Sequence, residues 1–194
     1  RALGYETVAL DEAVRRLEAD EPSPRFAVFT FDDAYRDNLV HALPVLRRHA
    51  CPFTLYVPTA FVDGTGEIWW QALEDIVARN DAIAFAGEGG IERRTTASLA
   101  QKQAVYAELY RRLRTMPEPQ RIALIRDLAA RQGYDLAAQC RALIMDWREL
   151  GEIARDPLCT VGAHTVHHYE LAKLPAAEAR EEIARSIDVL EERL

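Results

Sequence analysis

The sequence is poor in cysteine and has no long apolar run, and each shortage argues against a class of protein. Its three cysteines, Cys51, Cys140 and Cys159, are widely separated, and no Cys-x-x-Cys pair occurs. This pattern argues against a disulfide framework and favours buried thiols. No apolar run approaches the length of about 18 residues that a membrane-spanning helix needs, so we expect no membrane span in this segment.

Basic side chains are also in deficit, because 24 Lys and Arg stand against 31 Asp and Glu, which gives a formal charge of −7. The few arginine pairs fall within or beside helical patterns and form no basic stripe. Phosphate binding needs such a stripe, so nucleic acid is not expected as a partner.

The two ends of the sequence predict a piece of a longer chain. It begins with Arg1 rather than Met and ends at Leu194 within a helical pattern, so we expect both ends to be cut. A signal peptide or anchor could precede the segment. The localisation, cytoplasm or cell envelope, and the oligomeric state therefore stay open.

The composition fits a single globular domain over residues 1–194, because 49% hydrophobic residues at this length can form a substantial core. After an amphipathic helix over 7–19, the β-favouring run 26–31 predicts a parallel strand covered on both faces. A helix kinked at Pro44 and a strand over 53–57 follow. Together these elements predict a βαβ unit.

Residues 68–145 have a mostly helical pattern and are predicted to be an insertion within the domain. Its expected helices cover residues 69–79, 99–113 and 119–132. Asp146 and Glu149 then form a capping-box pair that begins another helix. A short strand over 158–161 follows, and Pro175 opens the last helix.

Two carboxylates, Asp32 and Asp33, come directly after the first predicted strand. Adjacent carboxylates at the mouth of an apolar strand repel each other and resist burial unless a cation is near. In an extended chain they point in opposite directions, so one can bind a metal while the other acts as a base. A turn with a helix cap is the alternative explanation of the pair.

Three of the five histidines lie within residues 164–168, just past another predicted strand. His164 and His168 are four residues apart, so one helical turn or a tight loop can aim both imidazoles at a single point. The pattern is not the His-Glu-x-x-His of zinc proteases, because Thr165 occupies the place of the required Glu. A structural or solvent-exposed histidine pair is the alternative.

Both clusters follow the carboxyl ends of predicted strands, which is the edge where α/β folds form active sites. One carboxylate and two neutral imidazoles supply three protein ligands and leave a position open for water, as in catalytic zinc sites. The second carboxylate could deprotonate that water. The two clusters together therefore predict a hydrolytic metal centre.

The same residues resemble two motifs of the polysaccharide deacetylases, carbohydrate esterase family 4, whose shared module is the NodB homology domain. Thr30-Phe31-Asp32-Asp33-Ala34 is similar to the family's Thr-Phe-Asp-Asp-Gly. Residues 164–168, His-Thr-Val-His-His, match its His-(Ser/Thr)-x-x-His. Residues 35–38, 42–46 and 162–165 also look like the family, and the resemblance spans residues 26–194.

The resemblance implies a role for each of five residues. Asp32 would be the general base, and Asp33, His164 and His168 would be the metal ligands. Thr165 would brace the loop that carries the two histidines. The metal would be a divalent ion, with zinc expected and cobalt or nickel as alternatives.

Five further positions are expected to matter less or depart from the family. His167 lies where the family leaves the residue open, and we expect it at the surface. Ala34 replaces the family's Gly, which puts the backbone there in question if it needs a positive φ. Tyr35, Trp69 and Trp70 are candidates for sugar binding, although a tryptophan at the start of an amphipathic helix usually belongs to the core.

The resemblance implies a distorted (β/α) barrel, cut short at its C-terminus, that removes N-acetyl or O-acetyl groups from a poly- or oligosaccharide. Water activated by the metal would attack the acetyl carbonyl with the help of Asp32. The family's oxyanion-binding, Trp-containing and general-acid segments would lie beyond Leu194, so the segment alone is expected to be a poor deacetylase. Hydrolysis of a non-sugar amide or ester, and an inactive sugar-binding relative, are the alternatives.

Overall fold

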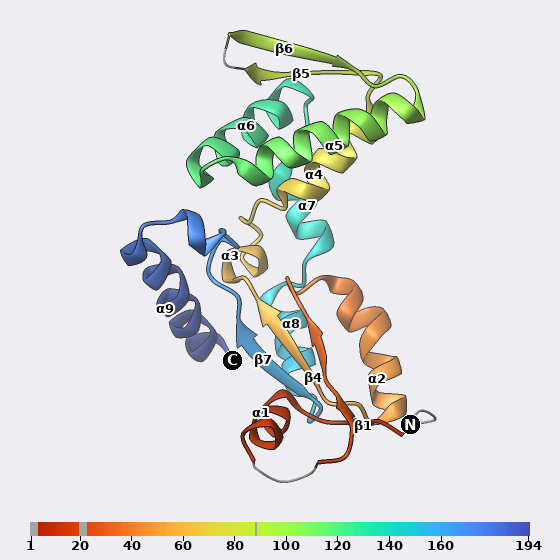
Figure 1. Ribbon diagram of the computed structural model, residues 1–194, viewed down its shortest axis with the longest axis vertical. Helices are drawn as coiled ribbons and strands as arrows, with labels where there is room; N and C mark the ends of the chain where they lie inside the picture. The colour runs from red at the N-terminus through yellow and green to blue at the C-terminus, as the bar shows by residue number, and fades with distance from the viewer. Residues whose placement is uncertain (1–3, 20–22, 88) are drawn as a thin grey trace.

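The computed structural model describes residues 4–19, 23–87 and 89–194, whose elements form two groups along the long axis (Figure 1). The first group holds the strands β1 (Glu6–Thr7), β2 (Phe26–Ala27), β3 (Phe29–Phe31), β4 (Phe53–Val57) and β7 (Cys159–Ala163). Its helices are α1 (Leu10–Glu18), a π-helical turn (Asn38–Ala42) continued by α2 (Leu43–His49), α3 (Thr59–Val62), α8 (Trp147–Ala154), a 3₁₀ turn (Leu171–Lys173) and α9 (Ala176–Arg193). The second group holds α4 (Trp69–Arg79), β5 (Ala82–Gly87), β6 (Gly90–Thr95), α5 (Leu99–Thr115), α6 (Glu118–Arg131) and α7 (Leu136–Leu143).

The first group is built on a three-stranded parallel sheet in the order β3-β4-β7. Phe31 pairs with Leu55, and Leu55 pairs with Val161, so the carboxyl ends of the three strands lie at one edge. The central strand β4 is almost wholly buried because neighbours cover it on both sides and both faces. This register brings the residues that follow β3 and β7 to a common edge of the sheet.

The prediction of a distorted barrel is not confirmed. The described residues form the β3-β4-β7 sheet, a parallel β1-β2 pair and an antiparallel β5-β6 pair, without a closed barrel. A (β/α) barrel needs about eight parallel strands to close, and this part of the chain supplies too few. The fold that the structure shows is therefore a mixed α/β arrangement with small sheets.

The expectation of a strand over 26–31 that is covered on both faces is wrong. The run breaks at Val28, so that β2 pairs with β1 while β3 pairs with β4. Phe29 and Thr30 are exposed, because no strand of the described structure flanks β3 on its other side.

The second group contains the expected helices α4, α5 and α6, but the sequence reasoning missed the hairpin of β5 and β6. Ile83 and Phe85 alternate with smaller residues and point into a core shared with these helices. The Gly-rich stretch after β5 and the β-branched Thr95 and Thr96 were the available indications. We call residues 68–145 the insertion segment; its status as an insertion stays a prediction.

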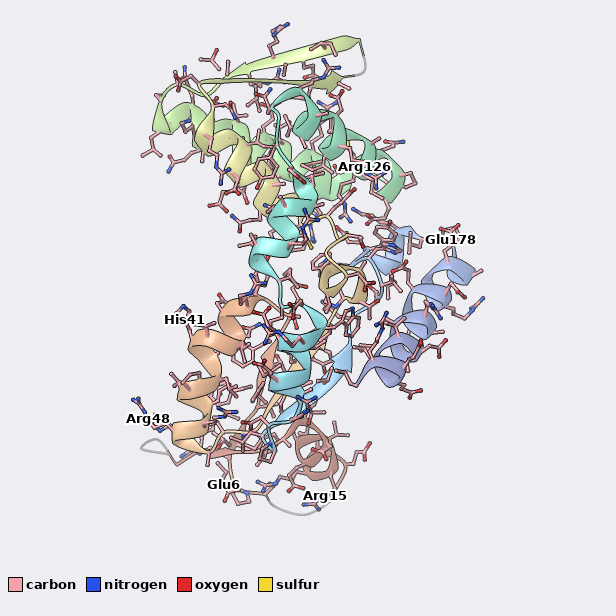
Figure 2. The ribbon with its side chains drawn as sticks, turned by 180° about the vertical axis from the view of Figure 1, so that it is seen from behind. Glu6, Arg15, His41, Arg48, Arg126 and Glu178 are labelled. Carbon is pink, nitrogen blue, oxygen red and sulfur yellow. The ribbon has the colours of Figure 1, made fainter. Side chains whose placement is uncertain are left out.

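Local sequence features explain several helix boundaries. The π-helical turn precedes α2, and Pro44 lies in the first turn of α2, where it needs no N–H partner. The kink at Pro44 stays a prediction. The capping box of Asp146 and Glu149 is confirmed at the start of α8. Seen from behind, charged side chains such as Arg48 and Glu178 lie on the outer faces of α2 and α9 (Figure 2). Within the described ranges, no helix has the length and apolar character to cross a membrane.

Candidate metal centre

The turn after β3 is built from two consecutive residues in the left-handed region. Asp33 has φ 70° and Ala34 has φ 56°. The Ala34 carbonyl accepts a hydrogen bond from the Met145 backbone N–H at 3.0 Å, and Tyr35 forms a β-bridge with Ile144. These contacts hold a conformation that costs a non-glycine residue roughly 1–2 kcal/mol. The family's Gly is thus replaced by Ala at a position that does have a positive φ.

The second half of the site is the loop over residues 164–170, which we call the histidine loop. It begins where β7 ends, and the His164 N–H donates to the Val57 carbonyl at 3.1 Å. Thr165 and His168 have φ 67° and 60°, so the loop turns sharply twice. The His168 N–H donates to Thr165 Oγ1 at 2.9 Å. Thr165 therefore lies where the resemblance would place a bracing residue.

The structure brings Asp33, His164 and His168 together. Asp33 Oδ1 lies 3.3 Å from His168 Nε2 and 3.8 Å from His164 Nε2. One ligand atom from each residue lies within 4.8 Å of the other two. Asp33 Oδ1 is buried and has no hydrogen-bond partner among the described residues. A buried, unpartnered carboxylate oxygen that faces two imidazole nitrogens suits a cation.

The electrostatics of the cluster leave the imidazoles neutral at neutral pH. Burial lowers the pKa of His164, and the neighbouring His168 lowers it further. Burial also lowers the pKa of His168, with a further contribution from the positive charge of Arg121. Burial raises the pKa of Asp33 to about 6, an effect that His164 opposes and Asp32 adds to. Neutral imidazoles have the free lone pairs that a metal needs.

Asp32 and Asp33 lie in different environments although they are neighbours in the chain. Asp32 is exposed, whereas the Asp33 side chain is only 13% exposed. The negative charge of Asp32, which directly precedes Asp33 in the chain, nevertheless raises the pKa values of Asp33, His164 and His168. The site thus combines one buried carboxylate with one that solvent and a substrate can reach.

Aromatic side chains pack beside His168. The Trp70 ring lies 5.1 Å from the His168 ring, and its Nε1–H donates to the Tyr35 hydroxyl at 3.1 Å. Burial raises the pKa of Tyr35 to about 12, so its hydroxyl keeps its proton. Trp69 is only 5% exposed, packs in the core of the insertion segment and lies under the Arg121 guanidinium. Tyr35 and Trp70 are therefore better placed than Trp69 to meet a ligand.

Residues that the sequence reasoning did not identify hold the histidine loop. Glu182 on α9 accepts hydrogen bonds from the N–H groups of Val166 and His167, at 3.0 and 2.9 Å. Its other oxygen lies 2.6 Å from His167 Nδ1, so the exposed His167 is tethered rather than free. Glu118 on α6 accepts from the Glu170 N–H at 3.0 Å. In the sequence these glutamates look like ordinary charges on helices, because nothing local reveals contacts so distant along the chain.

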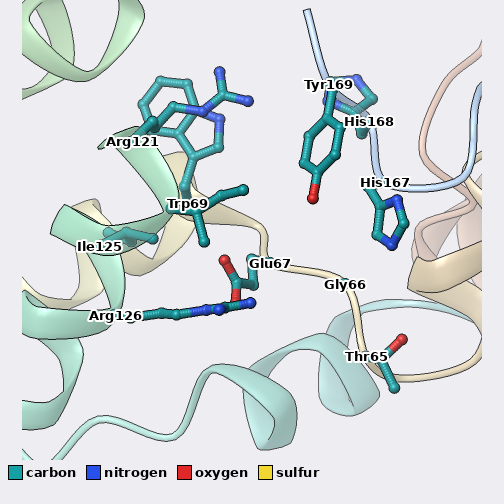
Figure 3. A pocket seen from close by; sticks show the side chains of 11 residues that line it. Thr65, Gly66, Glu67, Trp69, Arg121, Ile125, Arg126, His167, His168 and Tyr169 are labelled. Carbon is teal, nitrogen blue, oxygen red and sulfur yellow. The ribbon is translucent and has the colours of Figure 1, made fainter. Parts of the chain in front are cut away.

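A cavity of about 50 Å³ separates the histidine loop from the insertion segment. Figure 3 shows His168 and Tyr169 on one side of it and Trp69, Arg121 and Arg126 on the other. Such a volume holds a few water molecules and is far below the few hundred Å³ of pockets that enclose a small molecule. The cavity is therefore a gap between two packed surfaces rather than a place for a sugar ring.

A protein-family model covers most of the chain. The family model described as polysaccharide deacetylase matches residues 19–194. A putative polysaccharide deacetylase of Bacillus subtilis (strain 168), YxkH, is 38% identical over 55 residues, which is 28% of this chain and 20% of that protein. The BpsB deacetylase domain from Bordetella bronchiseptica aligns with all of this chain and 61% of its own, at 14% identity and a TM-score of 0.49. The chain thus matches a fifth of the length of the curated relative.

Proposed function

Because the chain belongs to the polysaccharide deacetylase family, we propose that it is a metal-dependent hydrolase that removes N-acetyl or O-acetyl groups from a poly- or oligosaccharide. The observation that supports this most is the approach of Asp33, His164 and His168 around a buried carboxylate oxygen without a hydrogen-bond partner.

Asp33 Oδ1, His164 Nε2 and His168 Nε2 would hold the ion. One oxygen and two imidazole nitrogens suit zinc, and cobalt or nickel would also accept this set. When bound, a divalent ion of this kind lowers the pKa of water and polarises a carbonyl oxygen. The lowered pKa values of both histidines support this assignment, because the imidazoles are ready to bind without first losing a proton.

Asp32 would be the general base. Its carboxylate is exposed beside the cluster, so it can accept a proton from the attacking water and pass it on towards the leaving group. Asp33 is poorly suited to that task because its side chain is buried and faces the two histidines. The sharp turn at Asp33 and Ala34 is what separates the two roles.

Tyr35 and Trp70 would border the acetyl group or its sugar. Their mutual hydrogen bond fixes the indole against His168, and aromatic faces suit the apolar faces of sugar rings. The Trp70 ring, tilted by 55° against the His168 ring, would also limit water access to that imidazole.

An acetate-release assay tests the proposal. The full-length protein with zinc or cobalt should deacetylate N-acetylglucosamine oligomers or acetyl-xylan, and a chelator should stop the reaction. Preference for one substrate would decide between N- and O-deacetylation. Activity only on a non-sugar amide or ester would favour a hydrolase of non-sugar substrates. Metal-independent sugar binding without acetate release would favour an inactive sugar-binding relative.

A further inference from the structure

The histidine loop holds its ligand His168 in an unfavourable backbone conformation. His168 and Thr165 both have positive φ, a region that non-glycine residues adopt only at a cost in free energy. A loop with such residues keeps its backbone conformation only if contacts with the surrounding structure stabilise it. Backbone N–H groups at the start of α3 hold the first part of the loop, because those of Thr59 and Ala60 donate to the carbonyls of Thr165 and Val166. Side-chain contacts come from two helices distant in the chain, α9 and α6.

On the α9 side, Glu182 accepts the N–H groups of Val166 and His167, which lie between the two histidine ligands. On the α6 side, Glu118 accepts the N–H of Glu170, two residues after His168. The loop is thus held before and after His168 by carboxylates that accept backbone N–H groups.

The contact with α6 is buried and carries charge. Glu118 and Arg121 are 1% and 4% exposed. They form an ion pair with each other, and Arg121 Nη1 also reaches Glu170 Oε1 at 3.2 Å. The Arg121 guanidinium lies 5.1 Å from the Trp69 ring, which fixes it to the core of the insertion segment. Both oxygens of Glu118 are therefore engaged, one with the loop and one with Arg121.

Stability alone does not explain the buried ion pair of Glu118 and Arg121. Burying two charges costs desolvation energy that their attraction often only balances, so a buried ion pair is weak evidence of net stabilisation. Here the pair instead delivers a rigid acceptor to one backbone N–H beside a strained ligand. Hydrogen bonds that orient a metal ligand typically change metal affinity about 10–100-fold.

We propose that Glu118 and Arg121 are positioning residues for the metal ligand His168, so that the insertion segment sets the metal affinity of a site it does not itself contain. The inference rests on the proposed metal site. Arg121 orders Glu118, Glu118 fixes the Glu170 N–H, and the fixed loop holds the His168 imidazole towards Asp33. Glu182 keeps the rest of the loop in place when this contact is lost.

The main test replaces the whole pair with apolar side chains, Glu118→Leu with Arg121→Met, so that no lone charge stays buried. Zinc affinity, measured by competition with a chromophoric chelator, should fall about 10-fold or more. The visible spectrum of the cobalt-loaded protein should change, because it reports ligand geometry. Circular dichroism should stay like that of the unaltered protein, since such replacements often preserve stability.

A second pair of variants isolates the single hydrogen bond and carries little folding risk. Glu170 has φ −72°, which proline accepts. Glu170→Pro removes the N–H that Glu118 accepts, whereas Glu170→Ala removes only the carboxylate. The proline variant should bind zinc several-fold more weakly than the alanine variant. Glu108→Gln is the matched control within the insertion segment, because its partner Arg94 lies far from the loop in sequence and pairs with Glu92 on the hairpin.

The outcomes separate the two proposals. If the unaltered protein binds zinc and His168→Ala loses it, the metal site stands. Zinc affinity and a cobalt spectrum unchanged in the double variant, with Glu170→Pro equal to Glu170→Ala, would then overturn the positioning role alone. An unaltered protein that takes up no zinc would overturn both.

Discussion

The carboxyl edge of the parallel sheet, where Asp33, His164 and His168 lie, differs in backbone conformation from the core of the insertion segment. Among the described residues, four of the five non-glycine residues with positive φ lie at this edge: Asp33, Ala34, Thr165 and His168. The described part of the insertion segment has none of them. Several of its charged groups form ion pairs, as in the network of Arg94, Glu92 and Glu108 on β6 and α5.

This difference shows that the residues in unfavourable backbone conformations are concentrated at the candidate site. Strained backbone and an unpartnered buried oxygen lower stability, and they persist at functional sites because surrounding contacts hold them. The described part of the insertion segment has no non-glycine residue with positive φ, although it buries the unpartnered side-chain amide of Gln139. It provides such contacts through Glu118 and Arg121. Each prediction below asks whether the two regions respond to similar changes in different ways.

The largest expected effect is on turnover at the exposed carboxylate. In the full-length protein, Asp32→Asn should lower the rate of deacetylation about 10²–10⁴-fold, because an amide cannot act as a base, while bound metal stays nearly unchanged. Acetate release and metal content of the same sample check this. Asp75→Asn, on α4 of the insertion segment, is the control and should keep the rate. Equal loss of metal from Asp32→Asn and Asp33→Asn would show that the roles are assigned wrongly.

Removal of one imidazole should have the next largest effect. His168→Ala or His164→Ala should weaken zinc binding about a hundredfold or more, because each supplies one of only three protein ligands. His167→Ala is the matched control: it lies in the same loop and keeps the backbone N–H that Glu182 accepts. Similar zinc affinities for all three alanine variants would contradict the ligand set.

The buried Asp33 should make metal-free stability depend on pH. Its pKa is raised to about 6 in the fold. The contribution of Asp33 to the free energy of unfolding is therefore fully present below about pH 4 and is lost as the pH rises towards 6, because ionisation is easier in the unfolded chain. At pH 8 in a chelator, Asp33→Asn should therefore be more stable than the unaltered protein, by up to about 3 kcal/mol. The advantage should vanish near pH 4. Urea unfolding at both pH values measures it, and a pH-independent difference would argue against a buried, ionised Asp33.

The smallest expected effect is the difference in the free energy of unfolding between two Ala→Gly substitutions, one in each region. Ala34 and Ala72 are both 0% exposed, but Ala34 is left-handed and Ala72 lies inside α4. Ala72→Gly should cost about 2 kcal/mol through lost helix propensity and a lost buried methyl. Ala34→Gly should stay within about 1 kcal/mol of the unaltered protein, because relief of the left-handed strain offsets the lost methyl. Equal costs in urea unfolding would mean that Ala34 is not strained.

Local patterns predicted much of the fold, because they depend on neighbours in the sequence. The buried run of β4, the helices α4 to α6 and the capping box of Asp146 and Glu149 were all available from periodicity and capping chemistry. The hairpin of β5 and β6 was missed within a mostly helical stretch, since its short alternation was weaker than the helical pattern around it. The exposure of β3 depends on which strands pair with it. A local sequence pattern does not predict those partners.

The residues of the candidate site also fall into those that local sequence patterns could predict and those that they could not. Asp33, His164 and His168 could be proposed from residue type and spacing, because each follows the end of a predicted strand. Glu118 and Glu182 could not, since their roles depend on helices that pack against the histidine loop from distant parts of the chain. The left-handed turn at Ala34 could only be suspected, from the family's glycine, and needed the backbone itself.

The most direct test of the account is an anomalous difference map recorded at the zinc edge from crystals of the protein grown with zinc. We predict one strong peak within about 2.0–2.2 Å of Asp33 Oδ1, His164 Nε2 and His168 Nε2. Asp32 should remain outside the coordination sphere, and the Glu118 contact to the Glu170 N–H should be retained. A peak at other residues, or no peak beside the histidine loop, would contradict the proposed metal centre.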